Sequence, residues 1–103
     1  MASGEIKKVT PTVTSNSNGK ILKINNLIVQ QTIEKTVNLK TQTTFTFPTT
    51  FPNKCLFAIP ICTQLGFGRP SVINSSFTTS SATVFQNNKA SASMRITVVA
   101  FGY

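Results

Sequence analysis

Few side chains in this sequence are of the types that catalysis requires. The chain of 103 residues contains no histidine, and its only acidic side chains are Glu5 and Glu34. Paired-carboxylate hydrolysis needs two carboxylates that face one bond, and Glu5 lies in a loose N-terminal segment. Serine and threonine are plentiful, but a hydroxyl nucleophile needs a base to activate it, and no lysine is marked for that role. We therefore expect that the protein is not an enzyme and needs no cofactor.

The two cysteines also lack the partners that would make them a metal site. Cys55 and Cys62 cannot form a structural zinc site alone, because such a site takes about four nitrogen or sulfur ligands. Their separation of seven residues is odd, so on one continuous strand they point to opposite faces and cannot form a disulfide. A bulge at Pro60 would change that count. We favour two buried thiols and no metal site.

Two groups of residues are candidates for receptor binding. Gln64, Phe67 and Arg69 lie in a segment that is a loop by composition, and an aromatic face beside a guanidinium suits a pyranose ring with a phosphate or carboxylate. The second group lies at a predicted hairpin tip and consists of Asn87, Asn88 and Lys89. In both cases the alternative is a solvated loop or turn whose residues are chosen for backbone geometry.

The charge balance is strongly basic. Ten lysines and arginines against two glutamates give a net charge of +8, which favours acidic partners such as nucleic acid, anionic polysaccharide or phosphate-bearing lipid and sugar. A charge spread only for solubility is the alternative. The basic residues are scattered, with no run beyond Lys7-Lys8. The segment Gly66 to Arg69 has a short likeness to strands that stack aromatics on single-stranded RNA, but Pro70 prevents such a strand from continuing. We expect no nucleic-acid partner, and a small basic β-barrel that binds single strands stays an alternative.

The elements that must position these loops are organised around residues 43 to 61. Phe45 and Phe47 alternate with threonines, which is the period of a strand with one buried face. The Phe-Pro pairs at 47–48 and 51–52 favour extended backbone, so this part should be a stiff crossing. The run from Cys55 to Ile61 is apolar at nearly every position and predicts a strand that is covered on both faces, either in a sandwich core or at a subunit contact.

The other predicted strands form hairpins with turn residues between them. Lys20–Ile24 and Leu27–Thr32 form a hairpin closed by Asn25-Asn26, with Leu22 opposite Val29 on one apolar face. The opposite face carries Ile21 and Ile28 among polar residues, which indicates either a second contact surface or two isolated exposed isoleucines. Residues 34–39 are ambiguous between helix and strand. Three further strands are expected at 71–77, 82–85 and 93–103.

The pattern as a whole predicts an all-β, antiparallel β-sandwich of about 6–8 short strands. We expect one domain at 19–103, preceded by a flexible or extended N-terminal segment at 1–18. Charged residues make up 12% of the chain, against about 25% in a typical soluble protein, and a threonine-rich surface is typical of extracellular and virion β proteins. No apolar run approaches the ~20 residues of a membrane span, and the N-terminus lacks the apolar core of a signal peptide.

Three segments together resemble the C-terminal domain of bacteriophage tail fibres, which is shared with prophage and R-type bacteriocin fibres. The family hairpin Gly-x-Ile-x-Leu-x-Asn-Gly-Leu-Ile-Ile-Gln-Trp-Gly is similar to Gly19 to Thr32 here, although Gln31-Thr32 replaces Trp-Gly. The family signature Phe-Pro-x-x-Phe-Pro-Asn-x-Cys matches Phe47 to Cys55, and is the most specific part. An apolar strand that ends in Gly-Tyr matches Ile96 to Tyr103.

This resemblance implies a β-sandwich that assembles as a homotrimer at the distal tip of a fibre. Its implied role is adhesion to a bacterial surface receptor, commonly lipopolysaccharide or another surface glycan, with the rest of the fibre or virion as a further partner. It implies a virion protein that is made in the host cytoplasm and released by lysis, without membrane insertion. A structural or capping virion module without receptor binding is the alternative. No receptor-contacting residues transfer from the family, because the matching motif residues look structural.

Overall fold

The computed structural model describes residues 10–38, 41–63, 73–86 and 93–103, and these form two antiparallel sheets without any helix. Nine strands lie in the described ranges, more than the six to eight that the sequence predicted. They are β1 (Thr12–Asn16), β2 (Gly19–Ile24), β3 (Leu27–Thr32), β4 (Lys35–Val37), β5 (Gln42–Thr46), β6 (Cys55–Cys62), β7 (Ile73–Phe77), β8 (Ser81–Gln86) and β9 (Met94–Gly102). The additional strands are β1, within the N-terminal segment, and the short β4, which settles the ambiguity at 34–39. With no helix in these ranges, the described part has none that is long and apolar enough to cross a membrane.

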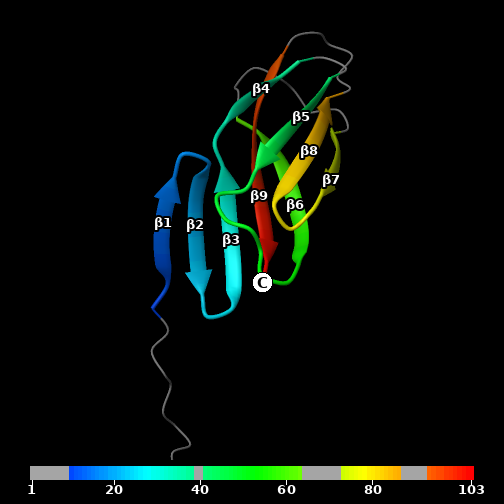
Figure 1. The fold of residues 1–103 in the computed structure, drawn as a ribbon. Coiled ribbons are helices and arrows are strands. Elements are labelled where there is room, and N and C mark those ends of the chain that lie inside the picture. Colours follow the sequence, from blue (N-terminus) through cyan, green and yellow to red (C-terminus); the bar gives the residue numbers. More distant parts are fainter. Residues whose placement is uncertain (1–9, 39–40, 64–72, 87–92) are drawn as a thin grey trace, which may run out of the picture.

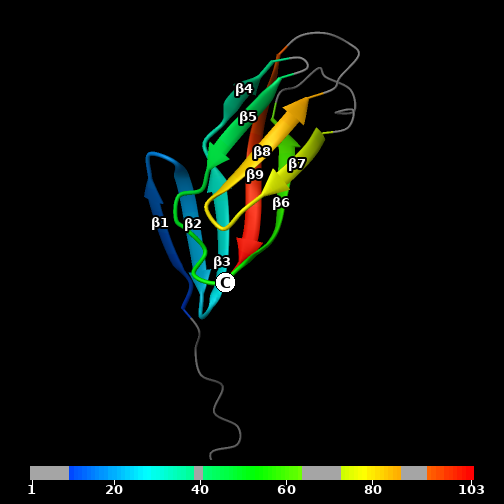
Figure 2. The same cartoon turned by 45° about the vertical axis from the view of Figure 1, so that its right-hand side comes forward.

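The two sheets differ in size and form a sandwich (Figures 1 and 2). The large sheet has the order β1-β2-β3-β9-β4, and β6 pairs with the other edge of β9. The small sheet has the order β5-β8-β7 and covers one part of the large sheet. We call the face of the large sheet that is turned toward the small sheet its inner face, and the opposite face its outer face. The predicted fold class is therefore confirmed.

Strand β9 is the centre of the large sheet. Its first part pairs with β4 and its last part with β3 on the same edge, while β6 follows it along the other edge. Between the two pairings, the hydroxyl of Thr32 accepts a hydrogen bond from the backbone N–H of Val98 (3.0 Å), and the hydroxyl of Thr97 donates to the carbonyl of Thr32 (2.7 Å). These bonds satisfy buried polar groups at the point where the chain passes from β3 to β4.

The Phe-Pro segment between β5 and β6 forms the predicted crossing. The rings of Phe47 and Phe51 pack edge to face with centroids 5.6 Å apart, and both are almost completely buried. The backbone of Thr49 donates to the side chain of Gln30 on the inner face (2.8 Å). The backbone N–H groups of Phe47 and Phe51 donate to the β7–β8 turn. The crossing therefore covers the part of the inner face that the small sheet does not reach.

The two motif segments at 47–55 and 96–103 meet in the structure. A Cβ atom on Gly102 would lie 2.7 Å from the ring of Phe51 and in still closer contact with the carbonyl of Lys54. The carbonyl of Tyr103 accepts hydrogen bonds from the backbone N–H groups of Asn53 and Lys54, both at 2.8 Å, and the N–H of Tyr103 donates to the carbonyl of Lys54 (2.9 Å). The glycine is therefore required because the ring of Phe51 packs directly on the backbone of β9.

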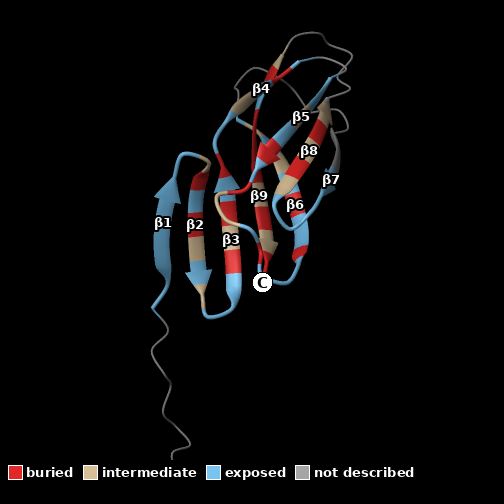
Figure 3. Ribbon diagram, viewed as in Figure 1, coloured by how far each residue is buried: buried red, intermediate tan, exposed pale blue. Residues whose placement is uncertain are grey.

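The hairpin of β2 and β3 has the predicted register, with Leu22 opposite Val29. Which of its faces is buried is, however, the reverse of the sequence expectation (Figure 3). Ile21 and Ile28 are 8% and 5% exposed and belong to the core, whereas Leu22 and Val29 are half-buried on the outer face. The expectation followed from the two polar residues on the Ile21 face, Lys23 and Gln30. Lys23 is exposed, whereas Gln30 is fully buried and its side-chain oxygen accepts the backbone N–H of Thr49 in the crossing. The amide nitrogen of Gln30 is buried without a hydrogen-bond partner in the described part of the chain.

Within one chain, only one of the two faces of strand β6 is covered. Ala58 is buried against the core, but Phe57, Ile59 and Ile61 point to the outer face and are 43 to 46% exposed. The register shift between Cys55 and Phe57 is a bulge at the start of this strand. One chain thus leaves an apolar face of β6 uncovered.

Candidate functional site

The receptor-binding candidates from the sequence lie outside the described residues. This applies to Gln64, Phe67 and Arg69 and to Asn87, Asn88 and Lys89. The strands that flank them are described: β6 and β8 end, and β7 and β9 begin, at the same end of the sandwich (Figure 1). The two predicted patches stay predictions.

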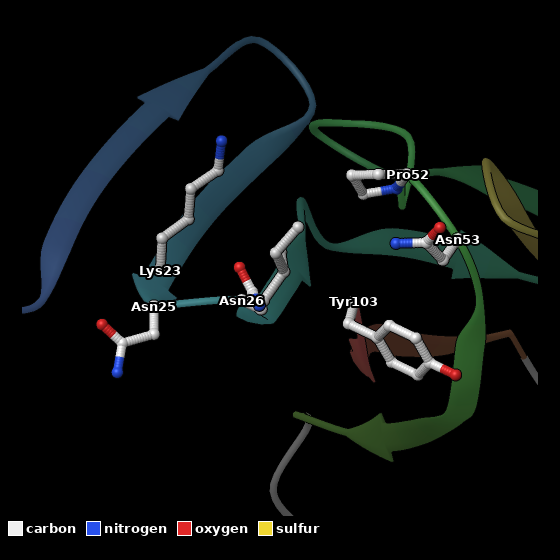
Figure 4. Close-up of a pocket in the computed structure, with 7 residues that line it drawn as sticks. Lys23, Asn25, Asn26, Pro52, Asn53 and Tyr103 are labelled. Atoms are coloured by element: carbon white, nitrogen blue, oxygen red, sulfur yellow. The ribbon is translucent and has the colours of Figure 1, made fainter.

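A pocket of about 320 Å³ lies at the opposite end of the sandwich, where the β2–β3 hairpin turns and β9 ends (Figure 4). Two segments far apart in the sequence form its walls. One is the hairpin tip and the other is the end of the crossing, next to the last residue of the chain. The pocket is lined by Lys23, Asn25, Asn26, Ile28, Pro52, Asn53 and Tyr103.

The backbone holds these walls in place. Asn25 takes a positive φ of 54° in the hairpin turn, a conformation that asparagine tolerates better than most residues. On the other wall, Asn53 and Tyr103 are fixed relative to each other by the backbone hydrogen bond between them. Lys23 and Ile28 are directly paired across β2 and β3. The pocket is therefore built on paired strands and a hydrogen-bonded connection.

The pocket lining combines amides, an aromatic ring and one cation. Three asparagine side chains supply both hydrogen-bond donors and acceptors, and Tyr103 is 43% exposed. Lys23 is exposed and is the only charged side chain among the lining residues. In Figure 4, Asn26 and Asn53 lie on facing sides of the hollow, while Asn25 points away at the rim. Buried Ile28 provides an apolar floor. Such a lining suits a small polar ligand.

The second candidate surface is the outer face of the large sheet. Its strand registers align five apolar side chains in one row across five strands: Val13, Leu22, Val29, Phe101 and Phe57. The rings of Phe101 and Phe57 are in contact, with centroids 4.7 Å apart. Val99 and Ile59 form a neighbouring pair, and Ile61 continues the apolar surface along β6. Contiguous exposed apolar faces of this kind are typical of contact surfaces, which makes this face a candidate.

Reactive chemistry is sparse in the described ranges. Cys55 and Cys62 both remain thiols, as the sequence predicted, although Cys62 is half-buried and not fully buried. Burial raises the pKa of the Cys55 thiol above its ordinary value, while a hydrogen bond with the backbone of Phe57 acts in the opposite direction. The carboxylate of Glu34 accepts a hydrogen bond from the hydroxyl of Thr63. The described residues contain no group of three or more potential metal-binding side chains.

The sequence did not identify the residues of either surface as a site. The pocket joins residues 23–28, 52–53 and 103, and only the pairing of β9 with both β3 and β6 brings these segments together. The Asn25-Asn26 turn was a visible signal, but it reads equally well as a simple hairpin turn. The outer face was partly visible in the alternating apolar residues of the last strand.

The comparison with family models gives a match over residues 17–103 to the family described as "Putative tail fiber protein gp53-like, C-terminal". A search of curated proteins found no significant match.

Among solved structures, the chain is similar to R-type pyocin tail fibres. The R2 pyocin fibre of P. aeruginosa superposes with a TM-score of 0.71 at 24% identity, over 92% of this chain and 26% of that chain. An N-truncated R2-type pyocin tail fibre gives 0.72 at 23% identity, over 92% and 38%. An N-truncated R1-type pyocin tail fibre gives 0.68 at 25% identity, over 92% and 87%. The chain thus spans well under half the length of the two R2 fibres.

Proposed function

The chain belongs to the family of C-terminal domains of gp53-like tail fibre proteins, and from this we propose that it is the tip domain of a fibre and binds a glycan on the bacterial surface. Lipopolysaccharide is the first candidate receptor, because a domain of net charge +8 is attracted to an acidic polymer. The domain is carried on the virion, and is made in the host cytoplasm and released by lysis. The family membership is the observation that carries this proposal.

The domain acts as a homotrimer whose chains meet through the outer faces of their large sheets. The apolar row of five side chains and the exposed side chains of β6 support this arrangement, since they lie on the face of the large sheet that neither the small sheet nor the crossing covers. We take further copies of this chain as the partners that cover the outer face, because the structural relatives are fibres. A chain of this size also gains stability from burying apolar surface between copies.

The domain binds without catalysis. The chain contains no histidine and two glutamates, and the one described glutamate, Glu34, is hydrogen-bonded to Thr63 on β6's C-terminal side. This leaves no described carboxylate pair for hydrolysis of a glycan. Adhesion then depends on several weak contacts made at once by three copies, which raises the overall affinity without any new contact.

The direct test is competition for the host surface. Excess purified domain should block adsorption of particles that carry the same fibre, and it should sediment with host cells but not with cells that lack the surface polysaccharide. A domain that never reduces adsorption, at any excess, would contradict receptor binding. That result would favour the alternative of a structural or capping module at the fibre end.

A further inference from the structure

The large sheet separates two surfaces by its two faces. In β2, Leu22 points to the outer face, whereas its neighbour Lys23 points to the inner side, because successive residues of a strand alternate. Lys23 is paired with buried Ile28, and both line the pocket at the hairpin end. The pocket therefore opens on the side of the sheet opposite the apolar row. A trimer closed through the outer faces leaves all three pockets accessible.

We infer that this pocket is a carbohydrate-binding site that takes one pyranose unit of an acidic surface glycan. The inference rests on the proposed function and adds a location and a ligand class to it. The volume of about 320 Å³ lies at the small end of the range for ligand pockets. The sugar stays partly exposed there, as the unit of a longer polymer must.

The lining has the groups that sugar recognition uses. The amides of Asn26 and Asn53, on the two walls, donate to and accept from ring hydroxyls. Tyr103 adds a half-exposed aromatic ring of the kind that packs on the apolar face of a pyranose. Asn53 and Tyr103 are linked by a backbone hydrogen bond of 2.8 Å, so this half of the site is already in position before the ligand arrives.

Lys23 gives the site its preference for an acidic sugar. Among the lining residues it is the only charged side chain, and no aspartate or glutamate faces it across the pocket. In Figure 4 its side chain runs along β2 away from the hairpin turn, on the side of the hollow opposite Asn53 and Tyr103. A carboxylate or phosphate on the sugar would therefore find a cation there, an attraction that salt weakens. The main-chain oxygen of Tyr103, which also lies at the pocket, accepts the N–H groups of Asn53 and Lys54.

The experiment is a titration of the trimeric, isotope-labelled domain with galactose, galacturonic acid and glucose 6-phosphate, followed by NMR. Amide shifts should concentrate at Asn25, Asn26 and Asn53, and the two acidic sugars should bind more tightly than galactose. Asn53→Ala keeps the backbone bond to Tyr103 but should weaken all three sugars about tenfold or more. Lys23→Met should remove only the preference for the acidic sugars.

Two residues that do not line the pocket provide matched controls. Lys35→Met and Asn38→Ala should leave every titration unchanged. The inference is overturned if none of the three sugars shifts the pocket amides, or if the pocket variants bind like the controls.

Competition for adsorption separates the proposal of adhesion from the proposal of this sugar site. If the pocket variants still block adsorption fully, the adhesion proposal stands and this location is wrong. If sugars bind in the pocket but the domain never blocks adsorption, the pocket is a sugar site and the adhesion proposal is wrong.

Discussion

At the scale of single residues, the fold depends on polar side chains that replace missing backbone partners. Thr32 is the clearest case. It is 4% exposed, and its hydroxyl accepts a hydrogen bond from the N–H of Val98, which lies between the part of β9 that pairs with β4 and the part that pairs with β3. Gln30 has the same role toward Thr49 in the crossing. Each bond joins segments far apart in the sequence, and neither partner could be identified from local pattern.

Replacement of Thr32 by valine tests this role. The variant keeps the shape of the side chain but leaves the buried N–H of Val98 unpaired, so the free energy of unfolding should fall by about 1–3 kcal/mol. Urea denaturation at one fixed protein concentration measures the change. Thr44→Val is the control, because Thr44 is exposed and its hydroxyl bonds to the hydroxyl of Thr83. Its effect should stay within about 0.5 kcal/mol. Equal effects of the two variants would contradict the role given to Thr32.

At the scale of elements, the Phe-Pro crossing and the end of β9 form one structural unit. Phe51 packs on Gly102, and three backbone hydrogen bonds join Asn53 and Lys54 to Tyr103. This unit closes the inner face at one end of the large sheet and forms one wall of the pocket. The two most recognisable sequence motifs are therefore structural, and the pocket wall is a consequence of their contact.

Gly102→Ala should disturb this unit. The new methyl group would force the ring of Phe51 and the carbonyl of Lys54 to move, which should cost about 1–3 kcal/mol, as overpacking of a core does. Because the wall of the pocket moves with them, the amide signals of Asn53 and Tyr103 should shift in NMR spectra, while those of β5 should not. A variant with wild-type stability and unchanged signals would show that Phe51 does not pack closely on this glycine.

Much of the element level was predictable from sequence. Alternation of Phe45 and Phe47, the Phe-Pro pairs and the Asn25-Asn26 turn gave the strands, the crossing and the hairpin register, because these depend on local backbone preferences. The buried face of the hairpin was not predictable. Ile21 and Leu22 are equally apolar, and only the crossing, which brings Thr49 to Gln30, decides that the Ile21 face is covered. The pocket was missed for the same reason, since its walls meet only after β9 has paired with two strands.

At the scale of the whole molecule, one sheet supports the proposed assembly on one face and the proposed recognition on the other. The outer face offers a row of apolar side chains from β1 to β6, including Val13, which is 68% exposed in the single chain. The only long polar side chains that the registers place in the next row are Lys20 and Gln31. An uncovered surface of this composition would promote aggregation unless copies of the chain cover it.

The most direct test of this account is the mass of the domain in solution, measured by sedimentation equilibrium at micromolar concentration. The wild-type domain should have three times the 11.2 kDa mass of one chain. Ile59→Lys places a charge in the middle of the outer face, where it would be buried without a partner, and should sediment with the mass of one chain. Thr46→Lys, at an exposed position of the small sheet, should keep the trimer. A wild-type mass of one chain, or an Ile59→Lys variant that stays trimeric, would contradict assembly through this face.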